Sequence, residues 1–98
     1  MFVYVDQFVS YPPGTVKGEP RAKYWCHMWA DSIEELHEFA AEIGMKRYWF
    51  QGPPIHKFPH YDLTKQRRAI AVKAGAIEVE EITREILIKM IKLGEEIA

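Results

Sequence analysis

The stretch PHYDLTKQRR, residues 59–68, places a histidine, an aspartate and three cations within ten positions of one another. His60 offers an imidazole that can act as a general base near neutral pH. Asp62 offers a carboxylate that can hold a metal ion or orient such a base. These residue types fit acid–base or metal-assisted chemistry, and the predicted catalytic residues are His60, Asp62 and Asp6.

The cations of this stretch lie at the start of a predicted helix. Lys65, Arg67 and Arg68 are unfavourable there by a few tenths to about 1 kcal/mol each, because the helix dipole is positive at that end. Unpaired backbone N–H groups at a helix start bind phosphate readily. We therefore expect an anion site, and the alternative is that Asp62 or Thr64 only caps the helix. The predicted substrate-binding residues are Lys65, Arg67, Arg68, Gln51 and His27.

Two further aspartates follow predicted strands. Asp6 ends a strand over 2–6, and Asp31 ends a strand over 23–31. Ligands of open α/β sheets bind beyond the carboxyl ends of the strands. Asp6, Asp31 and His60 are therefore expected to meet at one edge and to hold a divalent metal with a substrate phosphate. For Asp31 the alternative is that it only caps the following helix.

Histidine spacing by itself does not define a zinc site. His56 and His60 are four positions apart, but prolines separate them, so no helix places both on one face. Cys26 and His27 are neighbours on a predicted strand and point to opposite faces. A divalent metal is the cofactor that the pattern allows, and its identity stays open.

The composition predicts one soluble domain over residues 1–98. Apolar residues make up 48% of the chain, and 13 Lys+Arg against 14 Asp+Glu give a net charge of −1. This charge excludes a bulk attraction to nucleic acid or membranes. It conceals a basic middle, because seven cations and one acid lie between Lys46 and Lys73. The single cysteine and the lack of an apolar run of about 20 residues predict a cytoplasmic protein without a membrane partner.

Hydrophobic periodicity predicts an α/β fold in the order β-β-α-β-α-β-α, with a small mixed or mostly parallel sheet of about four strands and three helices. Ser32 and Glu35 have the spacing of a capping box, and Gly44 is placed to end that helix. The predicted strands cover 2–6, 23–31, 46–51 and 76–79, the helices 31–44, 64–75 and 81–98, and the Pro-rich loops 10–20 and 52–60.

The last helix is more apolar than one buried face requires. Its extra apolar residues include Leu87, Ile88 and Ile91. Residues 80–98 are therefore a candidate dimerisation appendage, and the chain is expected to form a homodimer through this helix. The alternative is that the helix lies across the chain's own sheet and is covered there.

Aromatic residues stand close to the cations of the basic middle. With these cations they can form a platform on which nucleic-acid bases stack. The alternative is that they pack in the core. The residues concerned are Tyr24, Trp25, Trp29, Tyr48, Trp49 and Tyr61.

Four motifs follow one another in a fixed order: VYVD, WCHMWADSIEELHEFAAEIG, RYWFQ and HYDLTKQRRAIAVKAGAIEV. In combination they resemble small bacterial and phage proteins grouped as domain-of-unknown-function family 4031, over residues 3–79. The resemblance implies a short cytoplasmic or phage-encoded protein, and it carries no reaction with it. The Pro-rich GPPIHKFP and the helix after Val79 depart from the pattern. The polar site positions that the resemblance implies are Asp6, His27, Asp31, His37, Gln51, His60, Asp62, Lys65 or Arg67, and Arg68.

Two functions follow from these patterns. The first is a site for a nucleotide or nucleic-acid phosphate, with metal-assisted phosphoester hydrolysis as its chemistry. The second is a non-catalytic homodimeric interaction protein, in which His60 and Asp62 only form a structural cluster. Convergence of the polar side chains on one site distinguishes the first from the second.

Overall fold

The computed structural model describes residues 2–10 and 24–97. Within these residues the chain forms one five-stranded sheet, three α-helices and a short 3-10 helix, η1. This is the predicted α/β class. In chain order the elements are β1 (Val3–Val5), β2 (Val9–Ser10), β3 (Tyr24–Ala30), α1 (Ile33–Glu42), η1 (Arg47–Trp49), β4 (Tyr61–Leu63), α2 (Lys65–Lys73), β5 (Ile77–Glu78) and α3 (Arg84–Ile97).

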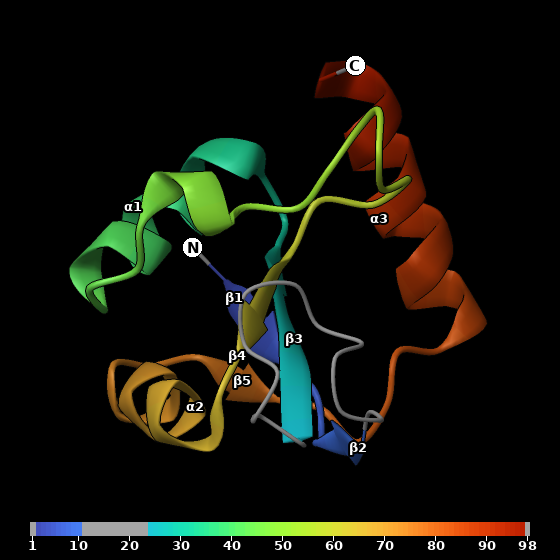
Figure 1. Ribbon diagram of the computed structural model, residues 1–98. Coiled ribbons are helices and arrows are strands. Elements are labelled where there is room, and N and C mark those ends of the chain that lie inside the picture. The colour runs from blue at the N-terminus through green and yellow to red at the C-terminus, as the bar shows by residue number, and fades with distance from the viewer. Residues whose placement is uncertain (1, 11–23, 98) are drawn as a thin grey trace.

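The sheet is mixed, as predicted, and β3 is its central strand. β3 pairs antiparallel with β1, β2 and β4, whereas β5 pairs parallel with β1. Figure 1 shows α1 and α2 on one side of these strands and α3 on the other. The two faces of the sheet therefore have different surroundings.

One face of the sheet forms the core with α1 and α2. Successive strand residues point to opposite faces, and alternate residues of β1, of β4 and of β3 from Cys26 onward are apolar and buried. Leu36 and Phe39 of α1 and Ala71 of α2 pack against them. The strand residues on this face are Val3, Val5, Cys26, Met28, Ala30, Tyr61 and Leu63.

The predicted caps fix the ends of two helices. The Ser32 hydroxyl accepts a hydrogen bond from the Glu35 backbone N–H at 3.2 Å, which begins α1. The Glu35 carboxylate accepts from the Phe2 backbone N–H instead of closing the capping box. Gly44 follows α1 with a φ of 79°, the left-handed conformation expected at that position. Thr64, rather than Asp62, caps α2.

The predicted strand over 46–51 is wrong. Residues 47–49 form η1, with backbone hydrogen bonds from Trp49 to Lys46 and from Phe50 to Arg47. The strand preference of aromatic residues comes from packing on a half-buried surface, and Tyr48 and Trp49 are exposed. Only Gln51 pairs with the sheet, through an isolated bridge to His60. The predicted loop over 10–20 lies outside the described residues except for Ser10.

α3 lies over the second face of the sheet. Ile86, Met90 and Leu93 of α3 and Tyr4 and Trp29 of the sheet help to line a cavity of about 370 Å³. Gly94, one turn after Met90, touches the Lys57 backbone carbonyl so closely that a Cβ would not fit. α3 therefore faces the chain's own sheet across this cavity and contacts the loop before β4. None of the helices in the described ranges is long and apolar enough to cross a membrane.

Candidate metal centre

A row of polar side chains crosses the second face of the sheet. His27 of β3 is the direct partner of Asp62 of β4. On the other side of β3, the Asp6 backbone N–H donates to the His27 carbonyl at 3.2 Å, which continues the register of β1 with β3. Residues directly opposite one another in a sheet share a face. The strand register therefore places Asp6, His27 and Asp62 side by side.

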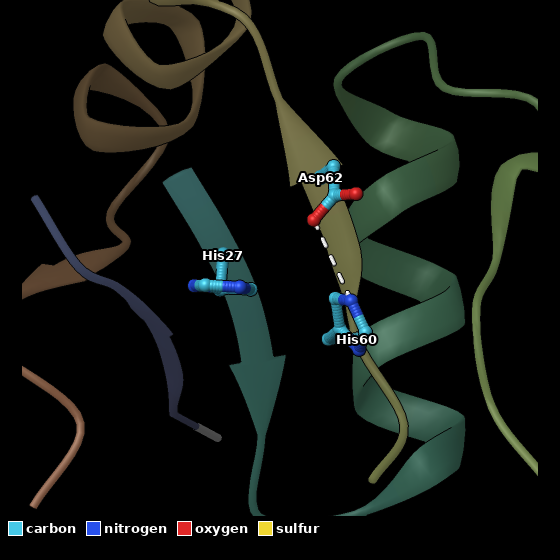
Figure 2. Close-up of side chains that lie close together, drawn as sticks. All are labelled: His27, His60 and Asp62. Atoms are coloured by element: carbon cyan, nitrogen blue, oxygen red, sulfur yellow. Dashed lines mark ion pairs between the residues drawn. The ribbon is translucent and has the colours of Figure 1, made fainter. Parts of the chain in front are cut away.

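His60 joins this row from the position just before β4. It lies two residues before Asp62, and residues two apart on an extended chain point to the same face. Its backbone pairs with Gln51 at 2.9 Å in both directions, which anchors the chain just before β4. Figure 2 shows His27 on β3, Asp62 on β4 and His60 just before β4, with the ion pair of His60 and Asp62 marked.

His27, His60 and Asp62 bring three potential metal-ligand atoms together. One nitrogen or oxygen of each residue lies within 4.8 Å of the others. Nε2 of His60 is 3.5 Å from Oδ1 of Asp62. Two ligands that each lie about 2.0–2.2 Å from one tetrahedral ion are separated by roughly this distance. The other two separations, which are at most 4.8 Å, would have to shorten toward this value for one ion to join all three residues.

Asp6 fixes the orientation of His27. The Asp6 carboxylate accepts one hydrogen bond from the His27 backbone N–H at 2.6 Å and a second from its ring Nδ1 at 2.7 Å. A carboxylate only accepts hydrogen bonds, so Nδ1 carries the proton and Nε2 is left with its lone pair. This carboxylate–histidine pair is the outer-shell arrangement that supports metal-binding histidines.

The other two candidate ligands are oriented in the same way. Nδ1 of His60 lies 3.0 Å from the Phe58 carbonyl and donates to it, which leaves Nε2 as an acceptor. The side-chain amide of Gln51 donates to Oδ2 of Asp62, which leaves Oδ1. Each of the three residues thus has one polar atom held by a partner and a second atom directed into the cluster.

The cluster favours a cation. With only Nδ1 protonated, His60 turns an acceptor toward another acceptor, Oδ1 of Asp62, whereas a second proton on Nε2 makes this contact an ion pair. A proton or a metal ion between them removes this conflict. Burial raises the pKa of Asp62, but hydrogen bonds and charge from His60 and Gln51 outweigh burial and leave this pKa below its ordinary value. The hydrogen bond to Asp6 raises the pKa of His27 despite partial burial.

Asp31 is not brought to this cluster. β1 and β3 run antiparallel, so their carboxyl ends lie at opposite edges of the sheet, whereas the expected meeting of Asp6 and Asp31 required parallel strands. Asp31 instead accepts hydrogen bonds from the Tyr4 hydroxyl at 3.1 and 3.2 Å and is exposed. The nearest acidic partner of His60 is Asp62 of its own strand.

The three cations of the α2 start have different surroundings. Arg67 donates to the Ile43 carbonyl at the end of α1 at 2.7 Å. Arg68 donates to the Asp6 carbonyl at 2.9 Å and forms an ion pair with Glu78. Lys65 is exposed. Arg68 therefore supports the backbone of Asp6 from behind the cluster, and anion binding by these cations stays a prediction.

The remaining candidate side chains lie outside the cluster. Cys26 is fully buried on the core face, and burial, followed by the charge of Asp6, raises the pKa of its thiol to about 12. It is therefore not available as a thiolate. His37 forms a hydrogen bond with the Tyr61 hydroxyl at 2.8 Å, also on the core side. The His56 ring lies 5.6 Å from that of His60 and borders the cluster.

Sequence reasoning identified these residue types but not their grouping. The YDL of β4 has a buried–polar–buried alternation that is typical of a half-buried strand. This alternation places Asp62 and His60 on one face. A pattern of only three residues is weak, however, beside the helix signals that follow it. The Phe58 carbonyl that orients His60 has no sequence signal, since it is a backbone atom.

Comparisons with known proteins give one match. No curated protein and no solved structure shows significant similarity to the chain. A family model described as "Protein of unknown function (DUF4031)" matches residues 3–92 of the 98. This match extends the resemblance seen in the motifs into α3. The chain belongs to the DUF4031 family.

Proposed function

We propose that the chain binds one divalent transition metal through His27, His60 and Asp62 and uses it to activate water for hydrolysis of a phosphoester. The observation that carries this proposal is the set of three anchors. Asp6, the Phe58 carbonyl and Gln51 each hold the second polar atom of one ligand. His60 and Asp62 satisfy one another as an ion pair only while His60 is protonated. When both histidines are neutral, the inward atoms of all three residues are acceptors that a metal ion can join.

Two imidazoles and one carboxylate favour zinc, with Fe²⁺ and Mn²⁺ as competitors. Mg²⁺ is disfavoured because it prefers oxygen ligands. Three protein ligands leave further positions for water or substrate, which is the arrangement of catalytic rather than structural zinc. The charge supports the same choice, since two carboxylates, Asp6 and Asp62, lie in or beside the cluster.

The cluster has access to water from one side. The side chains of His27 and Asp62 are 20% and 18% exposed, whereas that of His60 is 5% exposed. A bound ion lowers the pKa of a water ligand to about 7 and so supplies hydroxide at neutral pH. His56 borders His60 and is half-buried, so it is placed to exchange a proton with that water.

Metal binding is tested by calorimetric titration of the EDTA-treated protein with Zn²⁺, Mn²⁺, Fe²⁺ and Mg²⁺ separately. We expect one tight site for a transition metal and no comparable site for Mg²⁺. His60→Ala should abolish tight binding, whereas the matched control His37→Ala, which changes a histidine on the other face, should keep it. Equal binding by both variants, or no binding by the wild type, contradicts the proposal.

Hydrolysis is tested separately with bis(p-nitrophenyl) phosphate and the metal that binds most tightly. The expected result is metal-dependent release of p-nitrophenol that His60→Ala loses and His37→Ala retains. Release that does not depend on the metal, or none from the fully loaded wild type, contradicts the hydrolytic part of the proposal.

The second candidate function is homodimeric interaction through α3. Ile88 and Ile97 of α3 are 45% and 39% exposed, although Met90 and Gly94 of the same helix are buried in the chain. Ile88 adjoins the half-buried Leu87 and Ile91 on one side of α3, whereas Ile97 lies half a turn round the helix. Exposed apolar residues of this kind favour a partner surface. Light scattering on the wild type and on the double variant Ile88→Lys, Ile97→Lys tests it. A monomeric wild type contradicts this function, and a dimer that the variant dissociates supports it.

A further inference from the structure

The η1 segment exposes two aromatic side chains to solvent. Tyr48 is 77% exposed and Trp49 is 39% exposed. Their ring centroids lie 6.1 Å apart at an interplanar angle of 75°. Neither residue belongs to the hydrophobic core. Neighbouring exposed rings of this size are costly for solubility and favour a partner with flat apolar surfaces.

Cations accompany these rings. Lys46 and Arg47 are exposed, and the Lys46 ammonium lies 5.8 Å from the centroid of the Tyr48 ring. Residues 43–61 contain no Asp or Glu. The cations beside the rings favour a partner that is an anion with stackable rings. Exposed aromatics beside cations are the combination by which proteins bind single-stranded nucleic acid, because bases stack on the rings and phosphates meet the cations.

The aromatic pair is directly connected to the candidate metal centre. Phe50, the next residue, packs on Tyr61 of β4 with ring centroids 5.6 Å apart. Gln51 then pairs with His60 and donates to Asp62. Two residues span at most about 7 Å, so the backbone that carries Trp49 lies within that distance of the residue that orients a metal ligand. A single strand stacked on the rings would therefore reach the centre by passing Gln51, which links the two sites.

We propose that Tyr48 and Trp49, with Lys46 and Arg47, form a surface for single-stranded nucleic acid that presents a phosphodiester to the centre of His27, His60 and Asp62. The cleavage part rests on the proposed function. In that step the water oxygen forms a bond to phosphorus, and the bond from phosphorus to one sugar oxygen breaks. The proton lost by the water goes to the departing oxygen. The products are one phosphomonoester end and one hydroxyl end.

The binding part is tested without metal, so that it does not depend on the metal centre. Fluorescence anisotropy is measured in EDTA with labelled single-stranded DNA and RNA of about 12 nucleotides and with a duplex of the same sequence. We expect at least one of the two single strands to bind more tightly than the duplex. Binding should weaken with added salt, because phosphate contacts release counterions.

Variants on the surface identify the binding residues. Tyr48→Ala and Trp49→Ala should each weaken binding by at least about fivefold, the smallest effect expected for loss of one base stack. The matched control is Ile55→Ala, because Ile55 is 86% exposed and apolar in the same acid-free segment but offers no ring. It should leave binding unchanged.

The outcomes separate this surface from the metal centre. Ring-dependent binding of single strands in EDTA supports the surface even if no metal binds, in which case only the proposed function fails. Absent binding, equal binding of duplex, or equal affinity of Tyr48→Ala and the wild type overturns the surface even if zinc binds. Self-association that Tyr48→Ala abolishes, without oligonucleotide binding, also overturns it and assigns the rings to a contact between copies of the chain.

Discussion

The two faces of the sheet use the same strands for opposite purposes. Tyr61 and Asp62 are neighbours in β4, yet Tyr61 is almost fully buried on the core face and Asp62 faces the candidate metal centre. Likewise Cys26 and His27 are neighbours in β3. The core face is apolar and closed by α1 and α2, whereas the second face concentrates the imidazoles and carboxylates. Strand alternation alone therefore separates the residues that hold the fold from those that would hold a ligand.

The two faces contribute differently to the stability of the fold. Apolar side chains on the core face gain free energy by leaving water. The buried polar groups of the second face cost free energy unless each is paired, and Asp6 and His60 are both at most 5% exposed. A face of this kind contributes little to folding without its ligand. Substitutions on the two faces should therefore affect different measurements.

The largest expected effect on stability comes from the core face. Leu63→Ala removes a fully buried side chain from β4 and should lower the free energy of unfolding by about 2–5 kcal/mol, measured by urea denaturation of the metal-free protein. The neighbouring change Asp62→Asn, which keeps the side-chain shape, should cost much less. A larger loss of unfolding free energy for Asp62→Asn than for Leu63→Ala would contradict the different roles of the two faces.

The next effect is on metal affinity. His60→Ala and Asp62→Ala each remove one of three ligands, so zinc affinity measured by competition with a chelating dye should fall by more than about 100-fold, beyond the range for outer-shell changes. Leu63→Ala should bind zinc normally at temperatures where it is folded. Zinc binding that survives both ligand changes would place the metal elsewhere.

Smaller losses are expected from the anchors. Asp6→Asn and Gln51→Ala leave all three ligands in place but release His27 and Asp62 from their orienting hydrogen bonds. We expect zinc affinity to fall about 10–100-fold in each. Arg67→Ala, which changes a cation bonded to the end of α1, is the control and should not alter affinity. Wild-type affinity in Asp6→Asn would show that the carboxylate does not act through His27.

The smallest effect is a pH dependence. The hydrogen bond to Asp6 raises the pKa of His27, so in the metal-free protein this pair contributes stability that is fully present below about pH 6.5 and is lost as the pH rises through the raised pKa. The difference in unfolding free energy between wild type and Asp6→Asn should therefore shrink as the pH rises. Zinc competes with the same proton, so its affinity should increase over that range. A difference that grows with pH contradicts this sign.

The helices were predictable because their signals are local. Ser32 and Gly44 fixed the limits of α1 from their own side chains and backbone. The rest depended on tertiary packing. Aromatic residues at 46–51 predicted a strand, but no sheet partner covers Tyr48, and η1 forms instead. Local patterns report propensity and spacing, not which surface is covered.

Most of the site residues, but not their geometry, were also predictable. His27, His60 and Asp62 all stood among the candidates because of their chemistry. The strand direction was not predictable, since the pairing of β1 with β3 depends on contacts between distant residues. The antiparallel pairing places Asp6 far from Asp31 and beside His27.

The central claim is that His27, His60 and Asp62 bind one metal ion together. X-ray absorption spectroscopy of the zinc-loaded protein tests it most directly. The account predicts a first shell of nitrogen and oxygen at about 2.0–2.2 Å with the outer-shell signature of two imidazoles, no sulfur at about 2.3 Å, and loss of one imidazole in a residual zinc complex of His60→Ala. A spectrum without imidazole, or one identical in wild type and His60→Ala, would contradict it.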